Sequence, residues 1–321
     1  MDAGDQARRA AVRQAWRETL ERDPASDGEN FFAAGGNSIL VVALQRRLTT
    51  ALGYRLPLRR IHDQPTVDGI LGLAARHSVE QVPTSAPASG LDLYCLPYAG
   101  ASARVYDGWS DRLPAGVTVR PLEFPGRGSR WSEPPVARLP DLLVDLSAAM
   151  DTARPYVVFG HSFGGIVAFE LVRHLRAAGL PSPRRLLVSG CPAPHLATPA
   201  ETTHDLSDAE FTRRLRRLRG TPEELLANDE LMELYIPVIR ADYTILDHYR
   251  APAPTSLGCP ISAFYGRDDA EVTVGAIGEW SRYGDRPVTV EEVNGDHFFL
   301  HGAEAELVAK VAAHLDSDLN R

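Results

Sequence analysis

One serine in the second part of the chain has the surroundings of a nucleophile. Ser162 stands in the stretch FGHSFGG, where Gly160, Ser162 and Gly164 match the pattern Gly-x-Ser-x-Gly. An apolar run precedes this stretch and a helical run follows it, which predicts a serine on a sharp turn between a strand and a helix. A serine hydroxyl needs a base beside it, and the base needs an acid that orients it.

Candidates for the base and the acid follow two later apolar runs. His297 comes after the last run, and Asp268 and Asp269 come after the run before it. This order of serine, acid and histidine is the order expected for such a turn. We predict His297 as the base, with His301 as its rival, and Asp269 as the acid, with Asp268 as the alternative. Asp296 adjoins His297 and is poorly placed to reach its ring.

Backbone amides must stabilise the oxyanion that forms when such a serine attacks a carbonyl carbon. The residue after the serine, Phe163, offers one N–H group, and the loop after the first apolar run of this region offers a second. That loop reads LPYAGASA. We expect Ala99 to supply the second N–H group, with Tyr98 as the alternative.

A second serine, Ser38, also stands before a helical run, in the stretch FFAAGGNSIL. A serine at this position can cap the helix by accepting a hydrogen bond from a free N–H group. The same position also suits a covalently attached phosphate, because a helix N-terminus stabilises negative charge. The spacing alone leaves both interpretations open and slightly favours the cap.

The elements that must position these residues fall into two regions. Apolar residues at helical intervals predict a small all-α bundle over residues 1–78, and a stretch rich in Pro, Ser and Thr predicts a flexible linker over 79–90. From residue 91 to 321, short apolar runs alternate with helical ones, which predicts a mostly parallel sheet with helices on both faces. Residues 200–250 hold helical segments without a strand and are expected to form a lid.

Composition excludes several classes of function. The net charge is −8, which argues against a nucleic-acid partner. The chain has one lysine, Lys310, so it holds no phosphate-binding loop of the Gly-Lys-Ser type. Its three cysteines show no spacing typical of a metal site or a disulfide framework. Neither an apolar leader nor a membrane-spanning run is present, so we expect a cytoplasmic protein without a membrane partner.

Residues 91–318 resemble an α/β-hydrolase thioesterase of nonribosomal peptide and polyketide synthesis, specifically the type II branch. The stretches that carry the resemblance are LPYAGASA, PGRGSR, FGHSFGG, LLVSGCPAPH, LRGTPEELLANDELMELYIPVIRADY and NGDHFFL. The resemblance implies that Ser162, Asp269 and His297 form a catalytic triad and that the helical insertion forms the lid.

The stretch DGENFFAAGGNSILVVAL is similar to the core motif of peptidyl carrier domains. This resemblance implies that Ser38 receives 4′-phosphopantetheine from coenzyme A through a phosphopantetheinyl transferase. It also implies a place beside upstream condensation or other domains of a nonribosomal peptide synthetase, in antibiotic biosynthesis and secondary metabolism.

The order of carrier and thioesterase predicts that an acyl or peptidyl thioester passes from the arm on Ser38 to Ser162 and is released by hydrolysis or cyclisation. The type II resemblance supports an alternative, in which the enzyme removes aberrant acyl groups from carrier domains. A third hypothesis is a docking module without catalysis, and the presence of all three triad residues argues against it.

Overall fold

The computed structural model describes residues 3–36, 38–52, 56, 60–61, 64–77, 90–197, 202–203, 205–218, 226 and 228–320. Its contacts divide the chain near residue 88 into two compact units, which are treated separately below. The predicted linker over 79–90 lies outside the described residues except for Gly90. None of the described helices combines the length and the apolar character that a membrane crossing requires.

The first unit is a small helical bundle. Its described helices include α1 (Ala3–Leu20), α2 (Ser38–Leu52) and α4 (Val67–His77). Phe31 lies in the loop between α1 and α2, where its ring is fully buried and packs edge-on against Trp16, with ring centroids 5.1 Å apart. The core also includes Val41 and Leu44 from α2 and Ile70 from α4.

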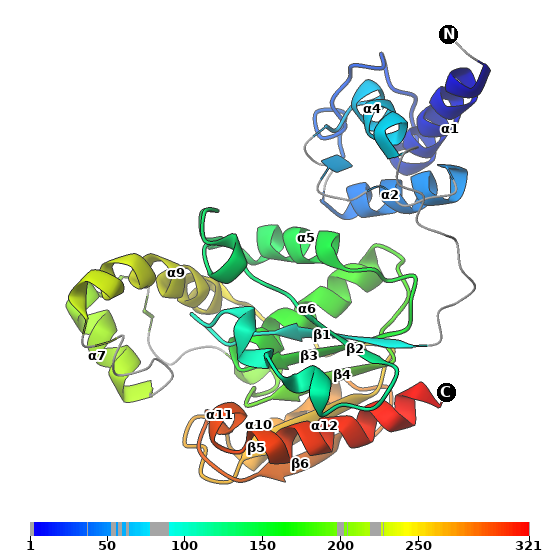
Figure 1. Ribbon diagram of the computed structural model, residues 1–321. Coiled ribbons are helices and arrows are strands. Elements are labelled where there is room, and N and C mark those ends of the chain that lie inside the picture. The colour runs from blue at the N-terminus through cyan, green and yellow to red at the C-terminus, as the bar shows by residue number, and fades with distance from the viewer. Residues whose placement is uncertain are drawn as a thin grey trace. The chain divides into compact units, whose positions relative to one another are not determined.

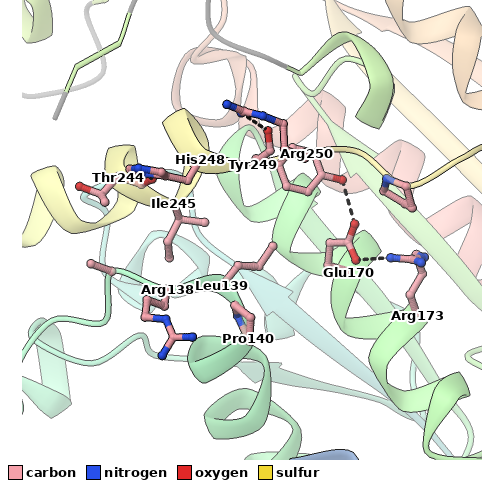
Figure 2. A pocket seen from close by; sticks show the side chains of 12 residues that line it. Arg138, Leu139, Pro140, Glu170, Arg173, Thr244, Ile245, His248, Tyr249 and Arg250 are labelled. Carbon is pink, nitrogen blue, oxygen red and sulfur yellow. Dashed lines mark hydrogen bonds and ion pairs between the residues drawn. The ribbon is translucent and has the colours of Figure 1, made fainter.

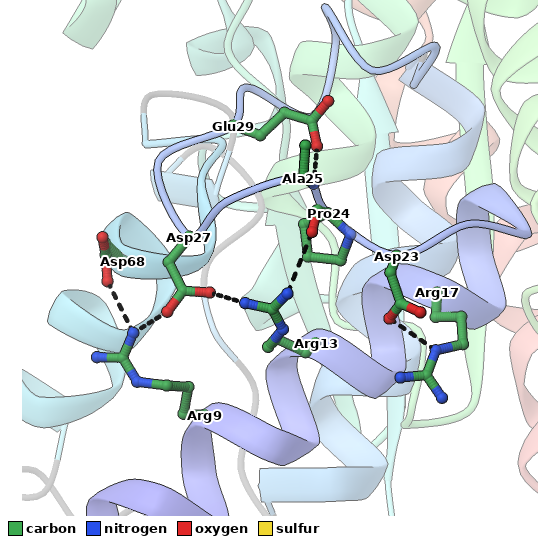
Figure 3. A network of polar contacts seen from close by, with 9 residues as sticks. All are labelled: Arg9, Arg13, Arg17, Asp23, Pro24, Ala25, Asp27, Glu29 and Asp68. Carbon is green, nitrogen blue, oxygen red and sulfur yellow. Dashed lines mark hydrogen bonds and ion pairs between the residues drawn. The ribbon is translucent and has the colours of Figure 1, made fainter.

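A network of charged side chains holds the long loop between α1 and α2 (Figure 3). Asp27 of this loop forms ion pairs with Arg9 and Arg13 of α1. Arg9 also forms an ion pair with Asp68 of α4 at 3.2 Å. The side chain of Arg9 therefore connects α1 both to the loop and to α4. These partly exposed pairs fix the path of the chain toward the start of α2 more than they add to stability.

The second unit is a six-stranded parallel sheet with the order β2-β1-β3-β4-β5-β6. The strands are β1 (Leu91–Leu96), β2 (Val117–Pro121), β3 (Tyr156–His161), β4 (Arg185–Ser189), β5 (Ile261–Gly266) and β6 (Thr289–Val293). All six apolar runs identified in the sequence form these strands. In β1, β3 and β4 every residue is buried, as expected of strands covered on both faces.

Helices cover both faces of this sheet (Figure 1). One face carries α5 (Leu139–Ala149) and α6 (Phe163–Ala177), and the other carries α12 (Glu304–Leu319). Apolar residues of α12 form one core with alternate residues of the strands, such as Leu93 and Phe159. Two shorter helices of this unit are α10 (Val274–Gly278) and α11 (Phe299–Gly302), and short 3-10 turns lie at Ala103–Tyr106, Trp109–Asp111, Gly128–Arg130, Pro194–Leu196 and Glu279–Arg282.

The insertion between β4 and β5 contains α7 (Asp208–Leu218) and α9 (Asp229–His248), and its described residues contain no strand. The sequence Ser-Asp-Ala-Glu at 207–210 has the pattern of a capping box, and the structure has it at the start of α7, since Ser207 and Glu210 exchange hydrogen bonds between side chain and backbone. The sequence predicts a second capping box at 221–224 and a helix-ending glycine at 220, and both lie outside the described residues. Residues of both helices share a small apolar core that includes Phe211, Leu215 and Ile236.

Candidate active site

Ser162 lies on the sharp turn that the sequence predicts, between the end of β3 and the start of α6. Its φ of 51° is in the left-handed region, which a residue with a side chain adopts only under strain. The neighbouring glycines allow this turn: a Cβ on Gly160 would lie 2.1 Å from the Gly164 carbonyl oxygen, and one on Gly164 would lie 2.3 Å from the Leu96 oxygen. The strand, the turn and the loop after β1 therefore pack too closely for any larger residue.

The structure brings three of the predicted residues together. His297 Nε2 lies 3.0 Å from Ser162 Oγ, and His297 Nδ1 lies 2.9 Å from Asp269 Oδ2. The Asp269 side chain is fully buried, and its other oxygen accepts hydrogen bonds from the N–H groups of Glu271 and Val272. The carboxylate is thus fixed in orientation and directs one ring nitrogen toward itself and the other toward the serine.

The alternatives do not join this group. Asp268 follows the same strand but is exposed to solvent. His301 lies 2.9 Å from the Tyr98 hydroxyl, and burial lowers the pKa of its imidazole. Asp296 accepts a hydrogen bond from the N–H group of Phe298.

The predicted oxyanion donors lie in two segments that meet at the turn. Phe163 is the first residue of α6, where an N–H group has no carbonyl partner within the helix. The loop after β1 contacts the turn at Gly164 and then forms a turn from Tyr98 to Ala101, closed by a 3.0 Å hydrogen bond. Gly100 has a φ of +79°, which is typical of the third position of a type II turn. Ala99 occupies the second position of this turn.

His161 supports the site in a way that the sequence did not reveal. Although it precedes Ser162 in sequence, its ring contacts other groups: Nε2 lies 3.0 Å from the backbone oxygen of His297, and Nδ1 lies 2.9 Å from Ser189 Oγ. Burial lowers the pKa of His161 well below its ordinary value, so the ring is neutral. A carbonyl oxygen only accepts, so the proton must be on Nε2, where it holds the backbone of His297 in place.

A separate cavity of about 570 Å³ lies between α6, the start of α5 and the end of α9 (Figure 2). Ile245, Leu139 and Pro140 give it an apolar wall. On its other side, Glu170 pairs with Arg173 at 2.6 Å and accepts a hydrogen bond from the Tyr249 hydroxyl at 2.9 Å. The cavity lining contains none of the three residues of the site. Among the described residues, no cluster of His, Cys, Asp or Glu is arranged to hold a metal ion.

In the first unit, the structure places Ser38 at the start of α2, where its first turn contains no acidic residue. The approach to this position requires glycine: a Cβ on Gly36 would lie 2.3 Å from the ring of the buried Phe31, and Gly35 has a φ of +103°. A phosphate attached at this end of a helix would meet the partial positive charge of the helix N-terminus and no carboxylate of that first turn. The surroundings therefore fit a phosphopantetheine group.

Comparison with known proteins decides the family. A family model described as the thioesterase domain matches residues 92–319. The chain belongs to the thioesterase family. A second model, described as the phosphopantetheine attachment site, matches residues 10–74, so a carrier domain precedes the thioesterase domain and the predicted cofactor is confirmed.

Relatives of the thioesterase domain include proteins named for linear gramicidin and for the borrelidin biosynthetic cluster. Linear gramicidin dehydrogenase LgrE of Brevibacillus parabrevis is 38% identical over 232 residues, which cover 71% of this chain and 88% of LgrE. The type II thioesterase BorB from the borrelidin biosynthetic cluster is 36% identical, covers 74% of this chain and 96% of its own, and superposes with a TM-score of 0.63. LgrE is named a dehydrogenase, whereas the family match and the Ser-His-Asp geometry describe a hydrolase.

One relative matches the carrier and the thioesterase together. The AMB antimetabolite synthetase AmbE of Pseudomonas aeruginosa is 32% identical over 315 residues, which cover 92% of this chain and 15% of AmbE. The predicted order of a carrier and an α/β-hydrolase thioesterase in nonribosomal peptide synthesis is therefore confirmed. Type II thioesterases among the relatives are consistent with a proofreading role as well as with product release.

Proposed function

We propose that the thioesterase domain releases acyl or peptidyl chains, held as thioesters on its own carrier domain, through an acyl-enzyme formed on Ser162. The observation that carries this proposal is the pair of contacts made by His297, at 3.0 Å to Ser162 Oγ and 2.9 Å to Asp269 Oδ2. Phosphopantetheine, when bound to Ser38, supplies the thiol that carries the chain. A phosphopantetheinyl transferase with coenzyme A would attach it, and upstream synthetase domains in the cytoplasm would load it.

In the first half of the reaction, Ser162 Oγ attacks the thioester carbonyl carbon while His297 Nε2 takes the hydroxyl proton. Asp269 accepts a hydrogen bond from Nδ1–H and stabilises the imidazolium that forms. The N–H groups of Phe163 and Ala99 stabilise the tetrahedral oxyanion, with Tyr98 as the alternative to Ala99. The carbon–sulfur bond then breaks, and the proton on His297 passes to the departing sulfur.

In the second half, His297 removes a proton from water or from a hydroxyl or amine of the chain itself. The activated oxygen or nitrogen attacks the ester carbonyl carbon on Ser162, and the proton returns to Ser162 Oγ as the ester bond breaks. Water gives a linear acid and an internal nucleophile gives a ring, and the same three side chains serve both outcomes.

A second candidate function is the removal of aberrant acyl groups from carriers, including carriers of other chains. The similarity to type II thioesterases such as BorB favours it. The two functions differ in the preferred cargo and in whether the carrier must belong to the same chain.

Two inactive variants separate the functions. Ser162→Ala keeps a carrier without a nucleophile, and Ser38→Ala keeps a nucleophile without a carrier arm. The wild-type chain and the Ser162→Ala variant are loaded with acetyl or with a longer peptidyl group by a phosphopantetheinyl transferase and the corresponding coenzyme A thioester. Mass spectrometry of the intact protein then follows the loss of the acyl group. For the Ser162→Ala variant, discharge is followed after the Ser38→Ala chain has been added.

Release from the chain's own carrier predicts fast discharge of the peptidyl group within the wild-type chain and slow, concentration-dependent discharge between chains. Proofreading predicts a preference for acetyl and efficient discharge between chains. Discharge of the Ser162→Ala chain alone at the wild-type rate would refute both functions, and a Ser38→Ala chain that still acquires the arm would refute the attachment site.

A further inference from the structure

The segment that follows β2 contacts both sides of the proposed oxyanion site. Glu123 accepts hydrogen bonds from the Ser102 hydroxyl at 2.9 Å and from the N–H group of Ala103 at 3.0 Å, so it holds the far end of the loop after β1. The ring of Phe124 packs edge-on against the ring of Phe163, with centroids 5.9 Å apart. The sequence of this segment continues into PGRGSR, a stretch that has no part in the triad.

Arg127 of this stretch forms a buried ion pair with Asp242 of α9. Its Nη1 and Nη2 atoms lie 2.5 and 2.8 Å from the two carboxylate oxygens, and the two residues are only 2% and 1% exposed. The guanidinium also lies against the ring of Phe124, 5.3 Å from its centroid. Such a two-bond contact fixes the orientation of both groups as well as their separation.

Asp242 also binds the turn that contains Ala99. Its Oδ2 atom accepts a hydrogen bond of 2.7 Å from the N–H group of Gly100, the residue next to Ala99. One turn earlier on α9, Ile239 packs directly on this glycine, since a Cβ on Gly100 would lie 2.8 Å from Ile239 Cγ1. The peptide between Ala99 and Gly100 is thereby held against one face of α9.

A gain in stability would not by itself explain the buried ion pair between Arg127 and Asp242. A buried ion pair often contributes little net stability compared with apolar residues of similar size, because both charges lose their hydration. The thioesterase domain has another pair of the same kind, between Arg185 and Asp318, with distances of 2.7 and 3.1 Å and similar burial. That pair joins the first residue of β4 to α12, at the end of the parallel strands opposite to the edge where Ser162 lies.

We propose that Arg127 and Asp242 are positioning residues, whose ion pair fixes the turn carrying Ala99 against α9 and so places the second oxyanion donor. The inference rests on the proposed function, because it assigns these two residues to the same acyl transfer. It also links α9 to the oxyanion site, because a displacement of this helix would move the turn that carries Ala99.

The test compares three variants in the full chain. Asp242→Asn can keep the hydrogen bond from Gly100 only with its N–H₂ group facing Arg127 Nη2, so it breaks the two-bond contact of the ion pair in either amide orientation. The double variant Arg127→Met with Asp242→Leu removes both charges and the acceptor for Gly100 while keeping an apolar core, which protects folding. Asp318→Asn is the matched control, because it disrupts the other buried pair.

The substrate is the butanoyl thioester of N-acetylcysteamine, and phenylboronic acid serves as a probe of the tetrahedral state on Ser162. We expect kcat to fall about 100-fold in both variants at Asp242, with KM changed by less than about threefold. The affinity for phenylboronic acid should fall in parallel with kcat. The control Asp318→Asn should keep kcat and boronate affinity near the wild-type values even where its unfolding midpoint is lowered.

Wild-type kcat in the folded double variant would overturn the inference, and so would an equal loss of kcat in Asp318→Asn. A failure of the proposed function would give a different result. The wild-type chain would then not cleave the thioester, or Ser162→Ala would cleave it at the wild-type rate. A wild-type enzyme that is active, with variants at Asp242 that are equally active, overturns only the role of the ion pair.

Discussion

Replacing Asp269 by Asn tests the proposed triad with the smallest change in shape. The carboxylate accepts two backbone N–H groups, at 2.8 and 3.0 Å, on one oxygen, and faces His297 Nδ1 at 2.9 Å with the other. An amide can present its oxygen to only one of these two sets. Facing the N–H₂ group toward the two backbone donors would remove both of these hydrogen bonds, at a cost of about 0.5–1.5 kcal/mol each. The oxygen will therefore stay on the backbone and the N–H₂ group will face His297.

This orientation forces the wrong tautomer on the base. With an N–H₂ donor beside it, His297 Nδ1 must accept, so the ring proton moves to Nε2, which then has no free lone pair for the Ser162 hydroxyl proton. A change of this kind in a serine triad lowers kcat by about 10⁴-fold, which corresponds to about 5 kcal/mol of transition-state stabilisation. Folding should be retained, because the two backbone hydrogen bonds remain.

The assay is single-turnover discharge of an acetyl-loaded carrier, followed by mass spectrometry, with Asp268→Asn as the control. Asp268 is adjacent in sequence but exposed to solvent, so its amide variant should react within about twofold of wild type. The reasoning would be refuted if Asp269→Asn kept more than about a tenth of the wild-type rate, or if Asp268→Asn lost as much.

Three further predictions concern stability. Ser162→Gly should be more stable than Ser162→Ala by about 1 kcal/mol in urea unfolding, because only glycine adopts a φ of 51° without strain; equal midpoints would contradict this. Burial lowers the pKa of His161 in the folded protein, whereas an unfolded histidine takes up a proton near pH 6.5. The free energy of unfolding should therefore decrease as the pH falls below about 6.5. Unfolding curves between pH 5.5 and 7.5 measure how steeply the free energy of unfolding changes with pH. His161→Gln should reduce this slope by up to about 1.4 kcal/mol per pH unit, and an unchanged slope would exclude the buried neutral ring. Gly36→Ala should destabilise the carrier bundle by about 1–3 kcal/mol, since its Cβ would lie 2.3 Å from the Phe31 ring, whereas Gly28→Ala should not. Amide hydrogen exchange in α1 and α2 measures the difference, and equal protection in the two variants would contradict it.

Most of the sheet and the position of the site could be predicted because the relevant patterns are local. Each strand is a short apolar run, and Ser162, Asp269 and His297 each follow one. The carboxyl ends of parallel strands meet at one edge, so position after a strand was enough to bring the three together. The choice between Asp268 and Asp269 was harder, because it depends on which side chain turns inward to accept the backbone N–H groups.

Contacts between distant segments could not be predicted in this way. Arg127 and Asp242 are separated by 115 positions, and neither stands in a periodic pattern that points to the other. The sequence offered only the stretch PGRGSR, without a partner for its arginine. His161 precedes the serine in sequence, but its bond to the backbone of His297 depends on the path of the chain after β6.

Both serines stand at the start of a helix, and the residues around each helix start determine what chemistry the serine can perform. At Ser38 an attached phosphodiester carries negative charge permanently, so the partial positive charge at the start of α2 suffices and no base is required. At Ser162 negative charge exists only during the tetrahedral state, so the start of α6 needs a base and a second donor that is already in place. In the proposed mechanism His297 supplies the first, and the turn held by Asp242 supplies the second. A catalytic serine of this kind therefore depends on residues from several elements, whereas a carrier serine depends mainly on the loop and helix around it.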